Sequence, residues 1–151
     1  MADPLIDLKA LLVEREECNA GTVTKLREGL AQGGPQFKNL RDISDLLKKK
    51  IEHSAPAAQK NLHLKLGVVN YFLGQTHLSI DHLKHAEGAL ANFYLGRALA
   101  SRGEYDDALK AYERSEKGGY AAIQVQLQRA GIFRLKGELK EAKHIDRKSV
   151  V

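Results

Sequence analysis

The sequence predicts an all-α protein built from short helices that pack as successive helix-turn-helix pairs. Apolar residues recur at intervals of three and four through most of the 151 residues, which is the spacing of one face of an α-helix. Runs of β-branched residues that would favour strands are few. Gly103 and Gly137 stand 34 positions apart in similar surroundings. This spacing indicates an internal repeat of helical units.

Residues 1–55 are expected to form an N-terminal helical segment of about three helices. The first is predicted over 3–17, where Asp3-Pro4 combines an acceptor side chain with a residue preset for a helix start. Its apolar residues share one face: Leu5, Leu8 and Leu12. Asn19 to Gly21 should interrupt this helix. The two helices around this break are predicted to form a hairpin.

The second helix is predicted to begin at Thr22 as its cap, and Gly33-Gly34-Pro35 should end it. Its apolar face holds Val23, Leu26 and Leu30. A third helix is expected over 37–53, where the basic residues 48–50 suit the negative end of the helix dipole. A long helix over 57–73 should follow.

The stretch 91–120 has the clearest pattern, two short helices joined by a turn at Gly103. Each has one apolar face, with Phe93, Leu95, Ala98 and Leu99 in the first helix and Tyr105, Ala108, Leu109 and Tyr112 in the second. Glycine permits the backbone of a tight turn. Small residues at Gly96 and Ala108 should let the two helices approach closely.

Related patterns lie on both sides of this stretch. RAGIFRLKGELKEAKHI repeats LGRALASRGEYDDALKAY after 34 positions, with Ala130 in the place of Gly96, Phe133 in that of Leu99 and Leu139 in that of Tyr105. Upstream, LGVVNYFLGQTHLSIDHL repeats it at a spacing of 29, which predicts a shortened second helix or turn. Units of about 34 residues with large and small residues at fixed places resemble the tetratricopeptide repeat (TPR) family.

The resemblance implies a right-handed TPR superhelix, an α-solenoid, over residues 56–148. Its three repeats would span about 60–88, 89–122 and 123–148. It also implies a protein-interaction scaffold that binds a helical or extended peptide of a partner in its concave groove. Carried over residue by residue, the main groove places are Leu64, Val68, Tyr71, Phe72, Phe93, Arg97, Leu127 and Arg134. The expected ligand has apolar anchors and one or two acidic residues.

The N-terminal helices 3–53 offer an alternative occupant of this groove, because they could fold back onto Tyr71 and Phe72. If the groove is free, replacing Phe93 and Arg97 by alanine should weaken partner binding and leave the helical signal intact.

Enzymatic chemistry is not predicted. The chain has no GxSxG, GxxxxGK[ST] or HExxH motif, so no catalytic residue and no cofactor is expected. His63, His77, His82 and His85 could supply two metal ligands, but no Cys or carboxylate stands at a matching spacing. Exposed helix histidines are the favoured interpretation, and no metal is expected. Cys18 has no histidine in its own segment that could activate it as a nucleophile.

The charge distribution supports a second hypothesis. The net charge is +5, and residues 129–148 carry seven basic residues against three acidic ones. A basic end could bind RNA or another anion. Aromatic residues are not interleaved with these charges, so a solvated face is favoured and nucleic acid is not expected as a partner.

The end of the chain and its composition lead to the last expectations. Leu139, Ala142 and Ile145 lack an obvious cover, which predicts either further repeats or self-association through 138–151. No apolar run is long enough to span a membrane, and the first residues do not resemble a signal peptide. With a single cysteine, these features favour a cytoplasmic protein.

Overall fold

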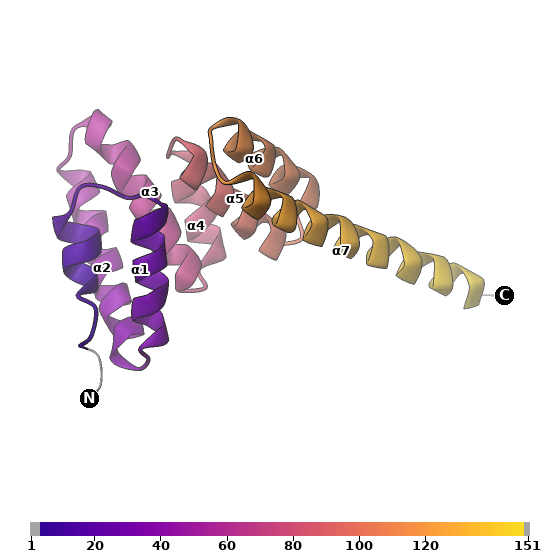
Figure 1. Cartoon of the computed structure of the whole chain (residues 1–151), viewed down its shortest axis with the longest axis horizontal. Helices are drawn as coiled ribbons and strands as arrows, with labels where there is room; N and C mark the ends of the chain where they lie inside the picture. The colour runs from indigo at the N-terminus through magenta and orange to yellow at the C-terminus, as the bar shows by residue number, and fades with distance from the viewer. Residues whose placement is uncertain (1–3, 150–151) are drawn as a thin grey trace.

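The computed structural model describes residues 4–149, and it describes the side chains of residues 4–140. A short π-helical segment, η1, is followed by seven α-helices, and no strand occurs in this range. Figure 1 shows the helices following one another from the N-terminus to a long last helix that extends beyond the rest. None of the described helices is long and apolar enough to cross a membrane. The bounds are η1 (Ala10–Glu14), α1 (Ala20–Ala31), α2 (Pro35–Glu52), α3 (Pro56–Phe72), α4 (Thr76–Lys84), α5 (Ala89–Ser101), α6 (Tyr105–Lys117) and α7 (Ala122–Ser149).

The helix predicted over 3–17 is wrong in extent. Residues 4–7 are not helical, and the side chain of Asp7 accepts a hydrogen bond from the backbone N–H of Ala10 at 3.0 Å. Asp7 thus satisfies a free backbone donor at the start of η1, the role that the sequence assigned to Asp3, which lies outside the described residues. The helical segment ends early because Arg15 is extended, with φ −82° and ψ 139°.

The start of α1 also differs from the prediction. Asn19 was expected to interrupt a helix, yet it caps one. Its side chain accepts from the backbone N–H of Thr22 at 3.1 Å, and its own N–H donates to the Thr22 hydroxyl at 3.1 Å. This reciprocal pair satisfies two donors at a helix start. The end of α1 at Ala31, just before Gly33-Gly34-Pro35, agrees with the prediction. Pro35 is also the first residue of α2, where its missing N–H costs no hydrogen bond.

Two helix pairs form the middle of the molecule, α3 with α4 and α5 with α6. Gly74 joins the first pair with φ +76°, and Gly103 joins the second with φ +78°. Both turns were predicted, and a glycine is needed because side chains disfavour this backbone region. Helix α4 has 9 residues against 13 in α6, which confirms the shortened second helix of the first pair.

Each pair is packed closely around a glycine on its first helix. A Cβ atom added to Gly96 would lie 2.7 Å from the ring of Tyr112, and one added to Gly67 would lie 2.4 Å from Leu83. Ala108 is fully buried on α6. The predicted close approach at Gly96 and Ala108 is therefore confirmed. In the first pair the Ser79 hydroxyl also donates to the Gly67 carbonyl at 2.6 Å.

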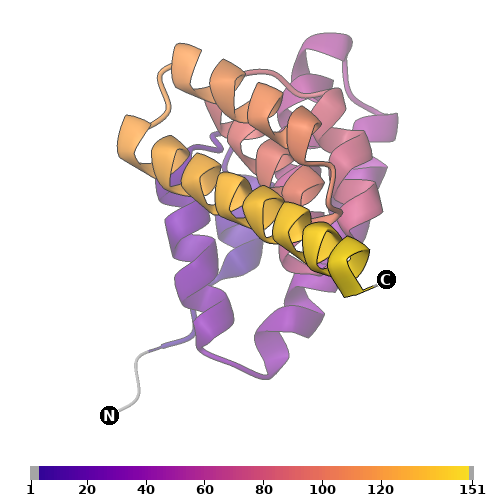
Figure 2. The same cartoon turned by 90° about the vertical axis from the view of Figure 1, so that its right-hand side faces the viewer.

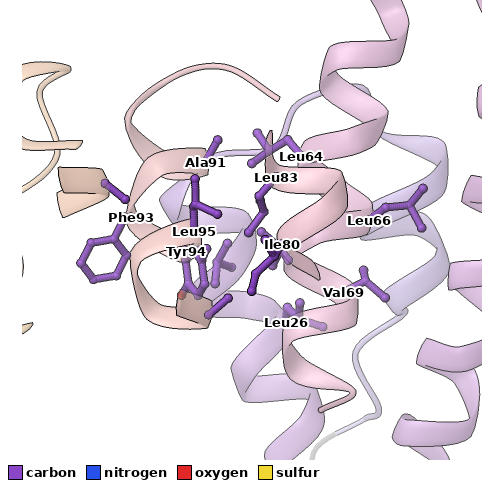
Figure 3. Close-up of a cluster of buried hydrophobic side chains, with 14 of the residues drawn as sticks. Leu26, Leu64, Leu66, Val69, Ile80, Leu83, Ala91, Phe93, Tyr94 and Leu95 are labelled. Atoms are coloured by element: carbon purple, nitrogen blue, oxygen red, sulfur yellow. The ribbon is translucent and has the colours of Figure 1, made fainter. Parts of the chain in front are cut away.

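The hydrophobic core is continuous from the N-terminal segment to the first half of α7. Figure 3 shows one part of it, where Leu26 of α1 lies in the same cluster as Val69 of α3 and Ile80 of α4. Helix α1 therefore packs on the helix pairs and is not a separate extension. Val125 and Ile132 continue the core on the inner face of α7.

The third repeat predicted over 123–148 is not a helix pair. Helix α7 runs without a turn from Ala122 to Ser149, straight through Gly137 (Figure 2). In the second pair Tyr112 fills the space beside Gly96. In α7, 34 positions later, Ala130 takes the place of Gly96 and Asp146 takes the place of Tyr112. An aspartate cannot supply the buried aromatic contact that holds a second helix against the first. Without that contact, one longer helix is the better solution.

Candidate functional site

A pocket of about 380 Å³ opens between α1, α5 and the start of α7. It joins segments from both ends of the chain, because α1 supplies one wall, α5 the opposite wall, and the turn before α7 the rim. Its lining residues are Ala20, Val23, Thr24, Arg27, Phe93, Tyr94, Arg97, Gly119, Tyr120, Ala121 and Gln124.

Stacked aromatic rings form the α5 side of this pocket. The ring of Phe93 lies parallel to that of Tyr120, with centroids 4.1 Å apart and 13° between the planes. Tyr94 meets the Phe93 ring edge-on at 5.5 Å. Gly119 has φ +100°, and this turn directs Tyr120 back onto α5. The aromatic wall is thus held by contacts on both sides, and little side-chain freedom remains to be lost on binding.

Two arginines give the pocket a positive charge. The guanidinium of Arg97 lies 5.4 Å from the ring centre of Tyr71 and 5.8 Å from that of Tyr94, which are cation–π distances. Arg27 reaches the pocket from α1. Among the described residues no ion pair joins either arginine to a carboxylate. The lining holds no Asp or Glu, so the charge of both guanidinium groups is directed to the pocket uncompensated.

The tyrosines of the site remain neutral at physiological pH. Burial raises the pKa of Tyr94 and of Tyr120, and the nearby arginines offset this only in part. A protonated phenol can both donate and accept a hydrogen bond. The pocket therefore combines apolar ring faces, hydroxyl groups and two cations. These features suit a ligand in which an anionic group is attached to an apolar group.

The residues predicted for the groove divide into three groups. Leu64, Val68 and Phe93 are buried, with Phe93 only 3% exposed, so they belong to the core and are not open groove surface. Their helices pack on neighbours on more sides than the repeat pattern implied.

A second group is partly exposed and lies in one place. Tyr71, Phe72 and Arg97 are half-buried, and all three lie around Tyr94. The last group is separate, because Leu127, which is 61% exposed, and Arg134 lie on α7 and do not line the pocket.

The N-terminal region does fold back onto α3, at a different place from the one considered in the sequence. The side chain of Asn61 donates to the Glu16 carbonyl, and the ammonium of Lys65 donates to that of Arg15. These contacts lie at residues 61 and 65, in the middle part of α3, before Tyr71 and Phe72. The aromatic end of α3 is left near the pocket.

Sequence reasoning missed three of the residues that shape this pocket: Arg27, Tyr94 and Tyr120. The Gly118-Gly119 pair before Tyr120 was the available signal, since a turn at this place can return the next side chain to the preceding helices. Arg27 carried no such signal, because its position depends on how α1 packs against α5.

The sequence also raised Cys18 as a nucleophile and the histidines as metal ligands. Burial raises the pKa of Cys18 to about 11, so its thiol stays protonated at neutral pH and is a poor nucleophile. In the described part of the chain no group of three or more His, Cys, Asp or Glu side chains is placed to hold a metal ion.

The basic residues of α7 are partly paired. Lys136 contacts Asp106 at 2.8 Å, and Arg129 lies 3.9 Å from Glu116. Leu139 is half exposed, as the expected lack of a cover implies. The side chains of Ala142 and Ile145 lie outside the described residues, and so does most of the segment 138–151 to which self-association was assigned.

Comparison with known proteins places no limit on the function, since no family model, no curated protein and no solved structure matches this chain. The function must therefore be argued from the pocket and from the repeat pattern.

Proposed function

We propose that this protein is a protein-interaction scaffold related to the TPR family, and that it binds a helical or extended peptide of a partner protein. The repeat spacing supports the family, as do two helix pairs that pack a large side chain against a glycine 16 positions earlier in both cases, Leu83 on Gly67 and Tyr112 on Gly96. The proposed binding site is the pocket between α1, α5 and the start of α7.

The two uncompensated arginines carry this proposal. Arg97 is half-buried against aromatic rings and Arg27 is exposed at the pocket. A guanidinium group without a carboxylate partner is well suited to bind an incoming carboxylate with two parallel hydrogen bonds. Arginine and aromatic residues are also the types that most often dominate binding energy at protein interfaces. A ligand that places an acidic side chain beside an aromatic or aliphatic one would use both features of the pocket.

The proposed binding site is bounded by different residues from the groove that the TPR resemblance implies. The binding residues become Arg27, Arg97 and Tyr120, and α1 forms one wall. Tyr71 does not line the pocket and contacts Arg97 from outside it. Leu64 and Val68 act only as support, and Phe93 holds the aromatic wall in place. A partner peptide would therefore lie across α5 and beside α1.

Two matched pools of fluorescent peptides test the proposal directly. Both present a Leu or aromatic anchor at varied positions, and they differ only in having two glutamates or two lysines beside the anchor. We expect the acidic pool to bind. Arg97→Ala and Arg27→Ala should each weaken this binding by about 1–3 kcal/mol, the range of interface hot spots.

Arg102→Ala provides the matched control, because Arg102 directly follows α5, is exposed, does not line the pocket and pairs with Glu104 at 3.6 Å. Its binding should equal that of the unchanged protein. If both pools bind equally, or if Arg102→Ala has the same effect as Arg97→Ala, the pocket is not the binding site. Binding that requires the basic residues of α7 would favour the anion-binding alternative.

A further inference from the structure

Three histidines of the first helix pair meet on one side of the molecule, remote from the aromatic pocket. His63 lies on α3, His82 on α4, and His85 is the residue at which α4 ends. The ring centre of His63 is 5.3 Å from that of His82 and 5.2 Å from that of His85. Residues from two helices thus present imidazole rings to one point.

The Nδ1 atoms of His63 and His82 are 3.0 Å apart. In a hydrogen bond one of these nitrogens must carry a proton and the other must present its lone pair. With both nitrogens deprotonated, two lone pairs converge. Two imidazole nitrogens that share a metal ion at about 2.0–2.1 Å are separated by roughly 2.9 Å at a right angle and by roughly 3.3 Å at the tetrahedral angle. The observed separation lies between these values, so the two nitrogens are spaced as two ligands of one ion would be.

The surroundings of the pair suit neutral imidazoles. Burial is the main cause that lowers the pKa of both His63 and His82, and neighbouring histidines add to it in both cases. Lys48 of α2 lowers the pKa of His82 further, while Asp81 raises it. Neutral imidazole is the form that binds metals. Asp81 places a negative charge near the same side of α4, which partly offsets the positive charge of Lys48.

We propose that His63 and His82 bind one divalent transition-metal ion through their Nδ1 atoms, with His85 as the nearest further imidazole and water in the remaining positions. Imidazole ligands suit copper, nickel and zinc, and the general order of stability puts Cu²⁺ first. When the ion binds, the Nδ1 proton of the hydrogen-bonding ring moves through water to Nε2 of the same ring, so both imidazoles stay neutral and both Nδ1 lone pairs are available. It links α3 to α4 across the pair, so its binding stabilises the folded chain.

Titration of the untagged full-length chain with Cu²⁺, Ni²⁺ and Zn²⁺ in a non-chelating buffer tests the site. We expect one Cu²⁺ per chain, coordination by two imidazole nitrogens in the electron paramagnetic resonance spectrum, and a rise in Tm. His63→Gln and His82→Gln should each lower the Cu²⁺ affinity by roughly a hundredfold, because the second ligand then loses the advantage of a preplaced neighbour. Binding of Ni²⁺ and Zn²⁺ should be weaker and should depend on the same two residues.

His53→Gln and His77→Gln are matched controls, since both side chains are exposed and neither contacts the rings of the pair; His77 pairs instead with Asp81 at 3.5 Å. Both variants should bind Cu²⁺ as the unchanged protein does. Circular dichroism without metal shows whether each variant is folded. The proposal is overturned if folded His63→Gln and His82→Gln bind Cu²⁺ normally, if a control loses as much affinity as they do, or if millimolar Cu²⁺ does not bind.

Discussion

Helix pair α5–α6 and helix α7 have closely similar sequences and different structures. Both contain a glycine followed by an acidic residue and an apolar one, Gly103-Glu104-Tyr105 in the pair and Gly137-Glu138-Leu139 in α7. In the pair the chain reverses at Gly103, and in α7 it continues as a helix through Gly137. A glycine at the right place is thus compatible with a turn but does not produce one.

The difference lies in what the second helix can bury. Beyond Gly103 the chain reaches Ala108, Ala111 and Tyr112, and all three are completely buried. Beyond Gly137 the place of Tyr112 is taken by Asp146. A helix that folds back gains stability only from the apolar surface that it buries, and this gain has to exceed the lost hydrogen bonds and ordering entropy of a turn.

Tyr112→Ala should have the largest effect, because it removes the side chain that holds α6 against α5. Tyr112 is 0% exposed and fills the space beside Gly96. We expect a loss of about 3–5 kcal/mol in the free energy of unfolding, measured by urea titration. Phe133→Ala in α7 is the matched variant, and since Phe133 is 53% exposed its loss should stay below about 1 kcal/mol. Equal losses would mean that α7 buries its aromatic residue as the pair does.

Gly96→Ala should lower the free energy of unfolding, by less than Tyr112→Ala does. A glycine-to-alanine change in α7, Gly131→Ala, should instead raise it. The new methyl group at residue 96 would overlap the ring of Tyr112, and such overpacking costs about 1–3 kcal/mol. Gly131 has nothing within 4 Å of an added Cβ atom, so Gly131→Ala should stabilise α7 by up to about 1 kcal/mol through helix propensity. Thermal unfolding of both variants would measure this, and a stabilised Gly96→Ala protein would contradict the close packing.

Gly103→Ala and Gly137→Ala make the smallest and most direct comparison. Alanine at residue 103 has to adopt φ +78°, which should cost about 1 kcal/mol. Alanine at residue 137 should instead increase the helix content of α7, by up to about 1 kcal/mol of local stability. Hydrogen exchange of the backbone amides around each site would show both changes. Faster exchange in Gly137→Ala would indicate that α7 bends there in solution.

Local sequence patterns predicted the parts of the fold that depend on neighbouring residues. The two helix pairs, their glycine turns and the short α4 followed from apolar spacing and small residues. The ends of the first helices did not, because Asp7 and Asn19 could each cap a helix or interrupt one, and only packing decides between these roles. The single helix α7 was not predicted because the third repeat was recognised by its turn glycine, Gly137. It was not judged by the large side chain that holds a second helix against the first, which is Tyr112 in the second pair.

The candidate site was predictable only where it lies within one segment. Arg97 and its aromatic neighbours near Tyr71 come from adjacent helices of the repeat pattern, and these were found. Arg27 was missed because no local pattern relates α1 to α5. Phe93 was found but given the wrong role, since burial from the side of Tyr120 cannot be read from the spacing of α5.

The pocket brings together residues that are about 100 positions apart in the chain, from Ala20 to Gln124. The helix pairs need only short loops to close, so they can form early, whereas contacts of such long range form late. During synthesis, which proceeds from the N-terminus, α1 must wait until α5 and the turn at Gly119 have left the ribosome. The ligand binding that we propose for this pocket therefore requires a nascent chain that has been synthesised at least as far as Gln124.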